Sequence, residues 1–154
     1  MPKFKDWAES VLGLDVNDKS NQTEALRELQ ADPPVENPGF LQEISGKVDE
    51  VNTNKASRIF HSHGHSIQEL YLLRTTKLER TIDYVVYITS HEQAEFLIVA
   101  AKKHNVVLIP FGGGTNVTQS LMLVPEEKRS IVSVDMTRMN KIKWVDKNNM
   151  MACI

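Results

Sequence analysis

Three absences in this sequence narrow the classes of protein to which it can belong. Cys153 is the only cysteine among 154 residues, so no intramolecular disulfide can form and a reducing, intracellular compartment is expected. The net charge of −2 gives no electrostatic reason to expect a nucleic-acid partner. No apolar run approaches the roughly 18 residues that span a membrane, and the first residues lack the apolar core of a secretory signal peptide. The length and the hydrophobic fraction of 41% are those of one ordinary globular domain.

A run of three consecutive glycines stands out in this sequence. It follows the apolar run 106–109, which is typical of a buried strand. Glycine can adopt a positive φ, and it lets a ligand approach the backbone because it has no Cβ. Successive N–H groups in such a turn can converge on an anion, typically a phosphate. A turn that merely ends the strand explains the glycines equally well. The candidate cofactor-binding residues are Pro110, Phe111, Gly112, Gly113, Gly114, Thr115 and Asn116.

The order of residues in this loop excludes two common nucleotide motifs. A P-loop requires Gly-Lys followed by Ser or Thr, and no lysine follows these glycines. The dinucleotide fingerprint requires a glycine at its sixth position, where counting from Gly112 gives Val117. Asp135 stands near the distance expected of the acidic partner in that fingerprint, but it ends an apolar run and no helical pattern follows the loop. A nucleotide site here is therefore neither kinase-like nor a typical NAD site.

A fixed order of segments surrounds the loop, namely 58–65, 72–74, 79–80, 109–115, 133–136 and 139–146. Together they resemble the alkyldihydroxyacetonephosphate synthases (alkylglycerone-phosphate synthases), flavoenzymes that make the ether bond of ether lipids. The resemblance runs from about Phe4 to Ile154. The glycine loop is shared with the wider vanillyl-alcohol-oxidase-type flavoproteins, whereas His63-Gly64-His65 and the segment 139–144 are narrower signals. Family members often carry serine at the position of Asn116.

The resemblance implies a cofactor and a reaction for the parent protein. It implies FAD, with the pyrophosphate held by the residues from Pro110 to Asn116, and no metal site. It also implies that acyl-dihydroxyacetone phosphate exchanges its acyl group for a long-chain fatty alcohol, by covalent catalysis at the flavin N5 atom and without net redox change. The catalytic residues are then expected beyond Ile154. A peroxisomal location, a homodimer in the full-length form and peripheral contact with membranes follow from the same resemblance, and no targeting signal is visible in this chain.

The residue pattern predicts an α+β fold whose N-terminal part is helical. This part covers residues 1–77, with a polar linker or extended arm at 15–37. Helical spacing and glycine stops predict one helix from Phe4 that ends at Gly13, and a short helix that runs from Pro38 to Gly46. Further helices are predicted after the capping-box pairs Ser66 with Glu69 and Ser90 with Gln93.

The second part, residues 78–154, is predicted to be the first part of a VAO/PCMH-type FAD-binding domain, truncated at its C-terminal side. A strand, a helix and a strand between Tyr84 and Ile109 make a βαβ unit, with the glycine loop at the carboxyl end of the second strand. Three further β segments are predicted to follow as a meander. They are 131–135, 141–145 and 150–154.

Polar side chains near the loop leave alternatives open. His61, His63 and His65 alternate, which on a strand places three potential metal ligands on one face. A polar turn that leads into the helix capped by Ser66 is the favoured interpretation, and an approach of one histidine to the active site is a third. The side chains of Thr115 and Asn116 are predicted to contact phosphate, and the alternative is that they cap the turn.

The end of the chain suggests a fragment. The apolar run Met150–Ile154 follows a turn and stops without a polar tail, so it is predicted to be a strand that returns beside 141–145. A fragment of this kind is expected to be catalytically inactive, and an unpaired strand edge is expected to lower its solubility. Two other functions remain open: a flavin-dependent 2-hydroxy-acid dehydrogenase or oxidase that uses the same loop, and a non-catalytic product that pairs with full-length subunits.

Overall fold

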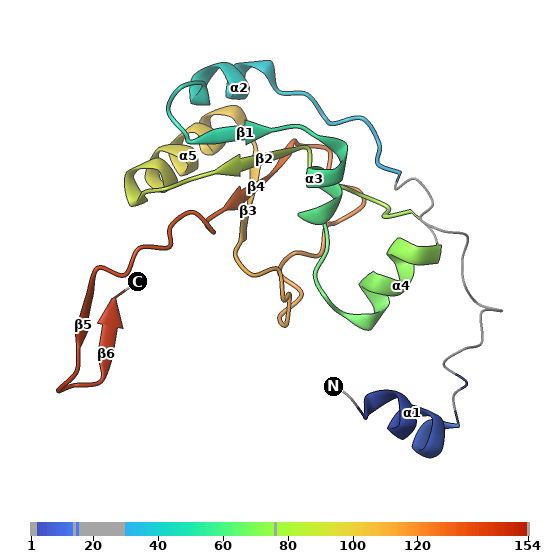
Figure 1. The fold of residues 1–154 in the computed structure, drawn as a ribbon. Coiled ribbons are helices and arrows are strands. Elements are labelled where there is room, and N and C mark those ends of the chain that lie inside the picture. The colour runs from blue at the N-terminus through green and yellow to red at the C-terminus, as the bar shows by residue number, and fades with distance from the viewer. Residues whose placement is uncertain (1–2, 14, 16–29, 76, 154) are drawn as a thin grey trace.

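A computed structural model describes residues 3–13, 15, 30–75 and 77–153 of the chain, and Figure 1 shows how their elements are arranged. Most of the linker predicted at 15–37 lies outside the described residues. The helices are α1 (Phe4–Leu12), α2 (Pro38–Ile44), α3 (Lys55–Phe60), α4 (Ile67–Thr75) and α5 (His91–His104). The strands are β1 (Glu50–Asn52), β2 (Tyr84–Tyr87), β3 (Val107–Phe111), β4 (Ile131–Asp135), β5 (Trp144–Asp146) and β6 (Met151–Cys153).

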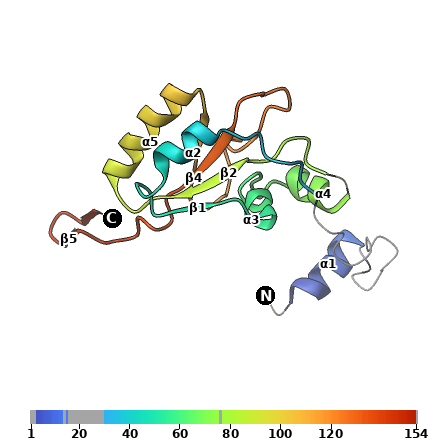
Figure 2. The same ribbon diagram turned by 90° about the horizontal axis from the view of Figure 1, so that it is seen from above.

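A four-stranded sheet in the order β1-β2-β4-β3 forms the centre of the structure. β1 pairs antiparallel with β2, and the β2–β4 and β3–β4 pairs are parallel. On one face, Tyr84 and Val86 of β2 pack with Phe40 of α2 and Leu97 of α5 in the larger apolar core. Figure 2 shows α2 and α5 together on this side of the sheet. Val85 points to the other face, where it belongs to a smaller apolar cluster.

The strand at residues 131–135 lies in a different position in the sheet from the one predicted. The α+β class and the β2–α5–β3 crossover are confirmed, but β4 lies between β2 and β3 and runs parallel to both, so it is not part of a meander. All five residues of β4 are buried, as expected for a central parallel strand covered on both faces. The order of strands along the chain does not reveal such an insertion, because loop connections allow a later strand to pair between earlier ones.

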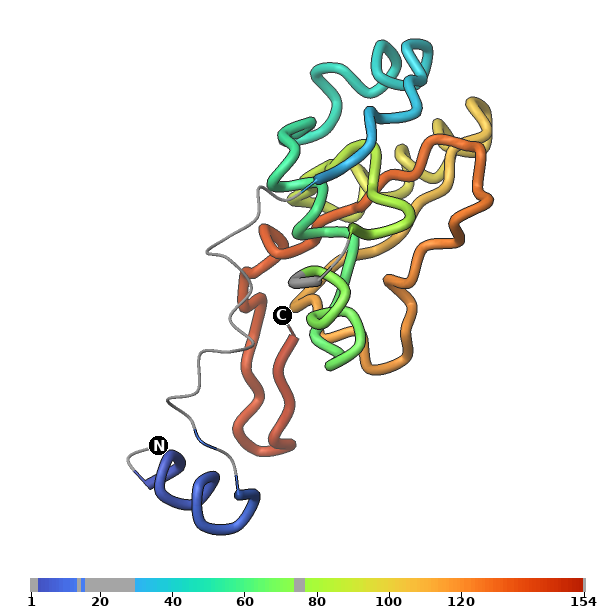
Figure 3. Tube along the Cα trace, turned by 90° about the vertical axis from the view of Figure 1, so that its right-hand side faces the viewer, coloured from blue at the N-terminus to red at the C-terminus, as the bar shows by residue number. Residues whose placement is uncertain are grey.

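The last two strands form a separate hairpin. Trp144 pairs with Cys153 and Asp146 with Met151 in a two-stranded antiparallel sheet. Figure 3 shows this hairpin extending away from the four-stranded sheet. The side chains of Trp144, Val145 and Met151 are 49%, 60% and 53% exposed, so the hairpin buries little apolar surface within the described part of the chain. The low solubility expected of this region stays a prediction.

Local signals placed several helix ends correctly. Both capping boxes form at the expected helix starts: the Glu69 N–H donates to Ser66 Oγ at 3.2 Å, and the Gln93 N–H donates to Ser90 Oγ at 3.4 Å. Gly13 follows α1 in the left-handed conformation with φ of 64°. Neither β1 nor α3 is predicted by the residue pattern, since three and six residues are too few to show a period. No helix among the described residues is both long and apolar enough to cross a membrane.

Segments from both predicted parts of the chain build the central sheet. β1 pairs with β2, and the Asn37 N–H donates to the Tyr84 hydroxyl oxygen at 3.1 Å. The boundary between residues 77 and 78 remains a prediction, but the segment that contains Asn37 is ordered against the first residues of β2.

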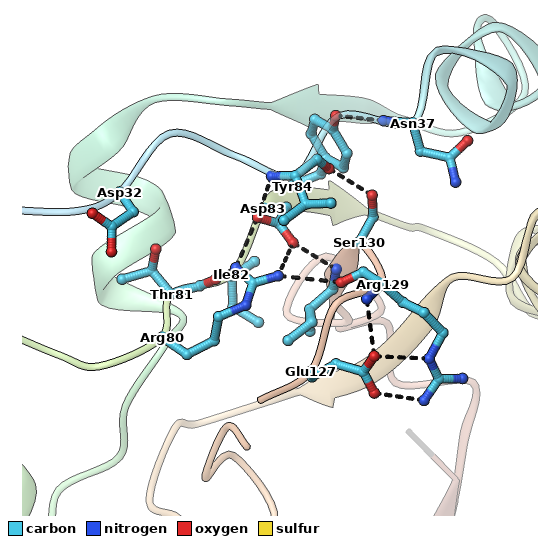
Figure 4. A network of polar contacts seen from close by, with 12 residues as sticks. Asp32, Asn37, Arg80, Thr81, Ile82, Asp83, Tyr84, Glu127, Arg129 and Ser130 are labelled. Carbon is cyan, nitrogen blue, oxygen red and sulfur yellow. Dashed lines mark hydrogen bonds and ion pairs between the residues drawn. The ribbon is translucent and has the colours of Figure 1, made fainter. Parts of the chain in front are cut away.

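Asp83 lies at the centre of the polar contacts between the segment that contains Asn37 and the first residues of β2, as Figure 4 shows. Its side chain is completely buried. Its Oδ1 accepts from the Val35 N–H at 2.8 Å, and its Oδ2 accepts from the Ile131 N–H at 2.7 Å. The Arg80 guanidinium donates to both oxygens, at 2.9 and 2.5 Å. One carboxylate therefore joins the segment before α2 to the starts of β2 and β4.

Replacing Asp83 with Ala is expected to destabilise the fold strongly. The variant leaves two backbone N–H groups without their acceptor and the Arg80 guanidinium without its carboxylate partner, and the loss of one member of a buried ion pair costs about 3–5 kcal/mol. Urea unfolding followed by circular dichroism measures the change. Asp32→Ala is the control, because Asp32 pairs with Lys77 at an exposed site where such contacts contribute below about 1 kcal/mol. Equal effects of the two substitutions would contradict the assigned role of Asp83.

Candidate functional site

The glycine loop lies where the parallel strands of the central sheet end. Phe111 is the last residue of β3 and pairs with Asp135, the last residue of β4. The Met136 N–H donates to the Phe111 carbonyl at 3.0 Å, which closes the end of this strand pair. In open α/β sheets, ligands bind outside the carboxyl ends of the strands. The predicted site residues therefore lie at the edge of the sheet where a ligand is expected.

Two of the three glycines leave open space at their Cα atoms. A Cβ added to Gly112 or Gly113 would have no atom within 4 Å, and neither residue has a φ that side chains disfavour. Both residues are exposed. The N–H groups of residues 112–115 donate to no acceptor in the part of the chain that the structure describes. Exposed donors beside a bare backbone fit an anion such as a pyrophosphate, which accepts hydrogen bonds from successive N–H groups.

Gly114 has a different role from the other two glycines. It is buried and adopts a left-handed φ of 68°. A Cβ at this position would lie 2.9 Å from Phe111 Cζ and 3.6 Å from His65 Nε2. Glycine is required here by both conformation and packing, so Gly114 shapes the loop while Gly112 and Gly113 keep it open.

Asn116 ends the loop through its side chain. It adopts a left-handed φ of 56°, a conformation that asparagine tolerates better than most residues. Its Nδ2 donates to Glu69 Oε1 at 2.7 Å, and its Oδ1 accepts from the Leu121 N–H at 2.8 Å. The Asn116 side chain therefore caps this turn. Thr115 is exposed, and the predicted contact of these residues with phosphate stays a prediction.

Glu69 accepts from four donors at once. Oε1 accepts from the Gly64 N–H as well as from Asn116, and Oε2 accepts from the N–H and the hydroxyl of Ser66. Burial raises the pKa of Glu69, but the hydrogen bonds from Ser66, Gly64 and Asn116 outweigh it, so the pKa lies below its usual value. The carboxylate is therefore ionised at neutral pH and joins the His-Gly-His turn to the glycine loop.

The three histidines do not share one face. His61 is buried, with Nε2 2.9 Å from Asp135 Oδ2 and Nδ1 2.8 Å from the Ser57 carbonyl oxygen, and its ring centre lies 4.4 Å from that of Phe111. His63 is partly buried and contacts the Gly64 carbonyl, whereas His65 is exposed. The polar turn before α4 is the arrangement observed. Among the described residues no group of three His, Cys, Asp or Glu side chains is placed to hold a metal ion.

A cavity of about 540 Å³ adjoins the contact between α4 and the loop. Glu69 and Asn116 both line it, together with the apolar side chains of Leu72, Met122 and Leu123. The cavity therefore lies beside the capped end of the loop.

Sequence reasoning missed three residues that shape this site. Glu69 was recognised only as a helix cap, Asp135 only as a poor match to a dinucleotide motif, and the need for glycine at position 64 was not foreseen. A Cβ on Gly64 would lie 1.9 Å from Asn116 Cβ, so these backbones can meet only because Gly64 lacks a side chain. The narrow His-Gly-His motif was the available signal that this turn has a specific neighbour.

Comparisons with known proteins identify relatives of the chain. Residues 82–154 match the family described as FAD binding domain. The chain is 34% identical over 97% of its length to alkyldihydroxyacetonephosphate synthase of Caenorhabditis elegans, and 39% identical over 87% of its length to that of Dictyostelium discoideum. A solved structure of alkyldihydroxyacetonephosphate synthase matches 84% of the chain with a TM-score of 0.77 and 38% identity.

The chain spans about a quarter of the length of these relatives, with shares of 25% and 22% for the two sequences and 25% for the solved structure. The resemblance inferred from the motifs is confirmed, as is the prediction of an FAD-binding domain with an α+β fold. The particular residues that contact FAD stay a prediction.

Removing the Asp135 carboxylate is expected to destabilise the chain in a pH-dependent way. Burial raises the pKa of Asp135, but hydrogen bonds from His61 and Thr137 outweigh it, so the folded-state pKa lies below the usual value. The carboxylate therefore stabilises the fold fully above its unfolded-chain pKa of about 4, and this contribution is lost as the pH falls through the folded-state pKa. We expect Asp135→Ala to lower the unfolding free energy by about 3 kcal/mol at pH 7.

Urea unfolding at pH 7 and at pH 3 measures this difference, which is expected to shrink at the lower pH. Glu95→Ala is the matched control, because Glu95 is an exposed carboxylate on α5 whose contact with His91 lies in solvent. A difference between wild type and Asp135→Ala that is the same at both pH values would contradict the stabilising role of the ionised carboxylate.

Proposed function

We propose that this chain, a homologue of the alkyldihydroxyacetonephosphate synthases over most of its length, holds the pyrophosphate of FAD in the loop from Pro110 to Asn116. The observation that carries the proposal is the row of N–H groups at residues 112–115, which have no acceptor within the described part of the chain and of which Gly112, Gly113 and Thr115 belong to exposed residues. The match of residues 82–154 to FAD binding domains supports the choice of this anion over others.

Different residues of the loop have different roles in binding the phosphate groups. Gly112 and Gly113 let the phosphate oxygens approach the backbone, since no Cβ stands in the way. Hydrogen bonds to a charged group contribute roughly 1.5–3 kcal/mol each, so two or three of them account for a substantial part of a cofactor's affinity. Gly114 and Asn116 supply the left-handed backbone conformations that turn the loop around the anion.

We further propose that the whole protein is an FAD-dependent alkylglycerone-phosphate synthase, which exchanges the acyl group of acyl-dihydroxyacetone phosphate for a long-chain fatty alcohol. The flavin would supply the covalent chemistry, and this chain's residues would bind and orient it. The support is the name shared by the relatives from Caenorhabditis elegans, Dictyostelium discoideum and Trypanosoma brucei brucei. A peroxisomal location and a homodimer of the full-length protein are part of the same proposal.

Blocking the loop is expected to abolish tight binding of FAD. A Cβ at Gly113 would have no atom within 4 Å and the residue is exposed, so we expect Gly113→Leu to fold normally while its side chain occupies the place of the phosphate. We expect the FAD dissociation constant to rise by at least about tenfold, which corresponds to the loss of one hydrogen bond to a charged group. Quenching of flavin fluorescence during titration measures the constant.

Two controls separate phosphate binding from other effects. Riboflavin, which has no phosphate, should bind weakly and equally to wild type and Gly113→Leu. Ser120→Leu places the same side chain on an exposed residue beyond the loop, and should leave FAD binding unchanged. Wild-type affinity for FAD in the Gly113→Leu variant would overturn the assignment of the loop.

The isolated chain is expected to be catalytically inactive, because it spans only a quarter of the length of its relatives. Incubation with FAD, acyl-dihydroxyacetone phosphate and an isotope-labelled long-chain alcohol should give no labelled alkyl product. Labelled product from the isolated chain would contradict this expectation.

For the whole protein, anaerobic bleaching of the bound flavin by a 2-hydroxy acid would favour the redox alternative over the transferase.

A further inference from the structure

We propose that Glu69 is a positioning residue for the glycine loop, and that it fixes the loop in its cofactor-binding shape through Asn116 and Gly64. This inference rests on the proposed binding of FAD by the loop. Glu69 belongs to α4, and it is separated from Asn116 by 47 positions in the sequence. The contact between them therefore joins two motifs that are independent along the chain.

The acceptor capacity of the Glu69 carboxylate is fully used within this contact. An ionised carboxylate offers about four lone-pair sites, and four donors lie within hydrogen-bonding distance. Gly64 N and Asn116 Nδ2 lie 2.8 and 2.7 Å from Oε1, and Ser66 N and Oγ lie 3.2 and 2.6 Å from Oε2. Two of these donors belong to the cap of α4, but the Gly64 N–H and the Asn116 amide do not. A helix cap alone does not require them.

The contact determines the backbone conformation of the loop end. Asn116 is left-handed, a conformation that residues with a side chain adopt uncommonly and that the contacts of asparagine with its surroundings stabilise. Glu69 holds the amide nitrogen of Asn116, which directs the amide oxygen toward the Leu121 N–H. Gly64 fits beneath the Cβ of Asn116, where any side chain would collide. The end of the loop is thus fixed from three directions.

The negative charge of Glu69 determines in which direction Glu69→Gln changes FAD binding under each explanation. A carboxylate near a pyrophosphate repels it, so removing that charge by Glu69→Gln would strengthen FAD binding if electrostatics alone mattered. If Glu69 positions the loop, the same substitution weakens binding, because a glutamine amide nitrogen cannot accept the hydrogen bonds that the lost oxygen accepted. The two effects have opposite directions, and a measured dissociation constant distinguishes them.

The experiment compares three variants of the chain by FAD titration and by amide hydrogen exchange without ligand. Glu69→Gln removes the acceptor oxygen for two of the four donors. Asn116→Gly removes the tether to Glu69 while keeping the left-handed conformation accessible. Ser66→Ala is the matched control, because it weakens the cap of α4 and leaves the contacts of Glu69 with Gly64 and Asn116 in place. Melting temperatures report whether each variant remains folded.

We expect Glu69→Gln and Asn116→Gly each to raise the FAD dissociation constant by on the order of tenfold, and to speed exchange in a peptide covering residues 112–121. The double variant should have an FAD dissociation constant no higher than that of the more affected single variant, because both substitutions break the same contact between Glu69 and Asn116. Ser66→Ala should leave the dissociation constant and the exchange of this peptide near wild type.

The outcomes separate the two proposals. If the wild type does not bind FAD, the proposed function fails, and hydrogen exchange alone then decides whether Glu69 orders the loop. If the wild type binds FAD and Gly113→Leu does not, but Glu69→Gln binds as well as or better than wild type, the positioning role is overturned. Equal loss in Ser66→Ala would likewise overturn it, because the helix cap would then account for the effect.

Discussion

The buried carboxylate of Asp83 is the interaction on which the arrangement of this structure depends. A carboxylate without exposure to water is tolerated only when its oxygens are hydrogen-bonded and its charge is paired. Asp83 meets both requirements with the Val35 and Ile131 N–H groups and the Arg80 guanidinium. Because these partners come from three segments, satisfying one charge also fixes where β2 and β4 begin relative to each other. A shift of either strand would leave at least one of these polar groups buried without a partner.

This register at the start of the strands sets the geometry at their other end. With β4 fixed between β2 and β3, Phe111 lies opposite Asp135 and the glycine loop leaves the sheet at its carboxyl edge. The His61 ring then packs against Phe111 while its Nε2 contacts Asp135. The loop is therefore supported at its beginning by a buried ring and carboxylate, and at its end by Asn116 and Glu69. Between these supports, Gly112 and Gly113 remain open to solvent.

Sequence patterns predicted the parts of the site that depend on local chemistry. The apolar run before the loop, the glycines and the capping residues Ser66 and Ser90 each act on neighbouring residues, so their effects can be read from spacing. The position of β4, the Glu69–Asn116 contact and the His61–Asp135 contact could not be predicted in this way. Each joins residues tens of positions apart, and periodicity contains no information on which distant side chains meet. The resemblance to a family supplied the class of ligand, but it did not supply these contacts.

The same contacts explain how carboxylates and a phosphate-binding loop can lie close together. Glu69 and Asp135 are ionised near the place proposed for an anion, and unscreened negative charges there would oppose its binding. Each carboxylate instead faces donors from the protein: four donors around Glu69, and His61 and Thr137 around Asp135. The negative charge of each carboxylate is thus largely compensated by these donor groups of the protein. The loop N–H groups at 112–115 remain uncommitted to these carboxylates, so the donors that an anion needs stay available while the carboxylates hold the loop in shape.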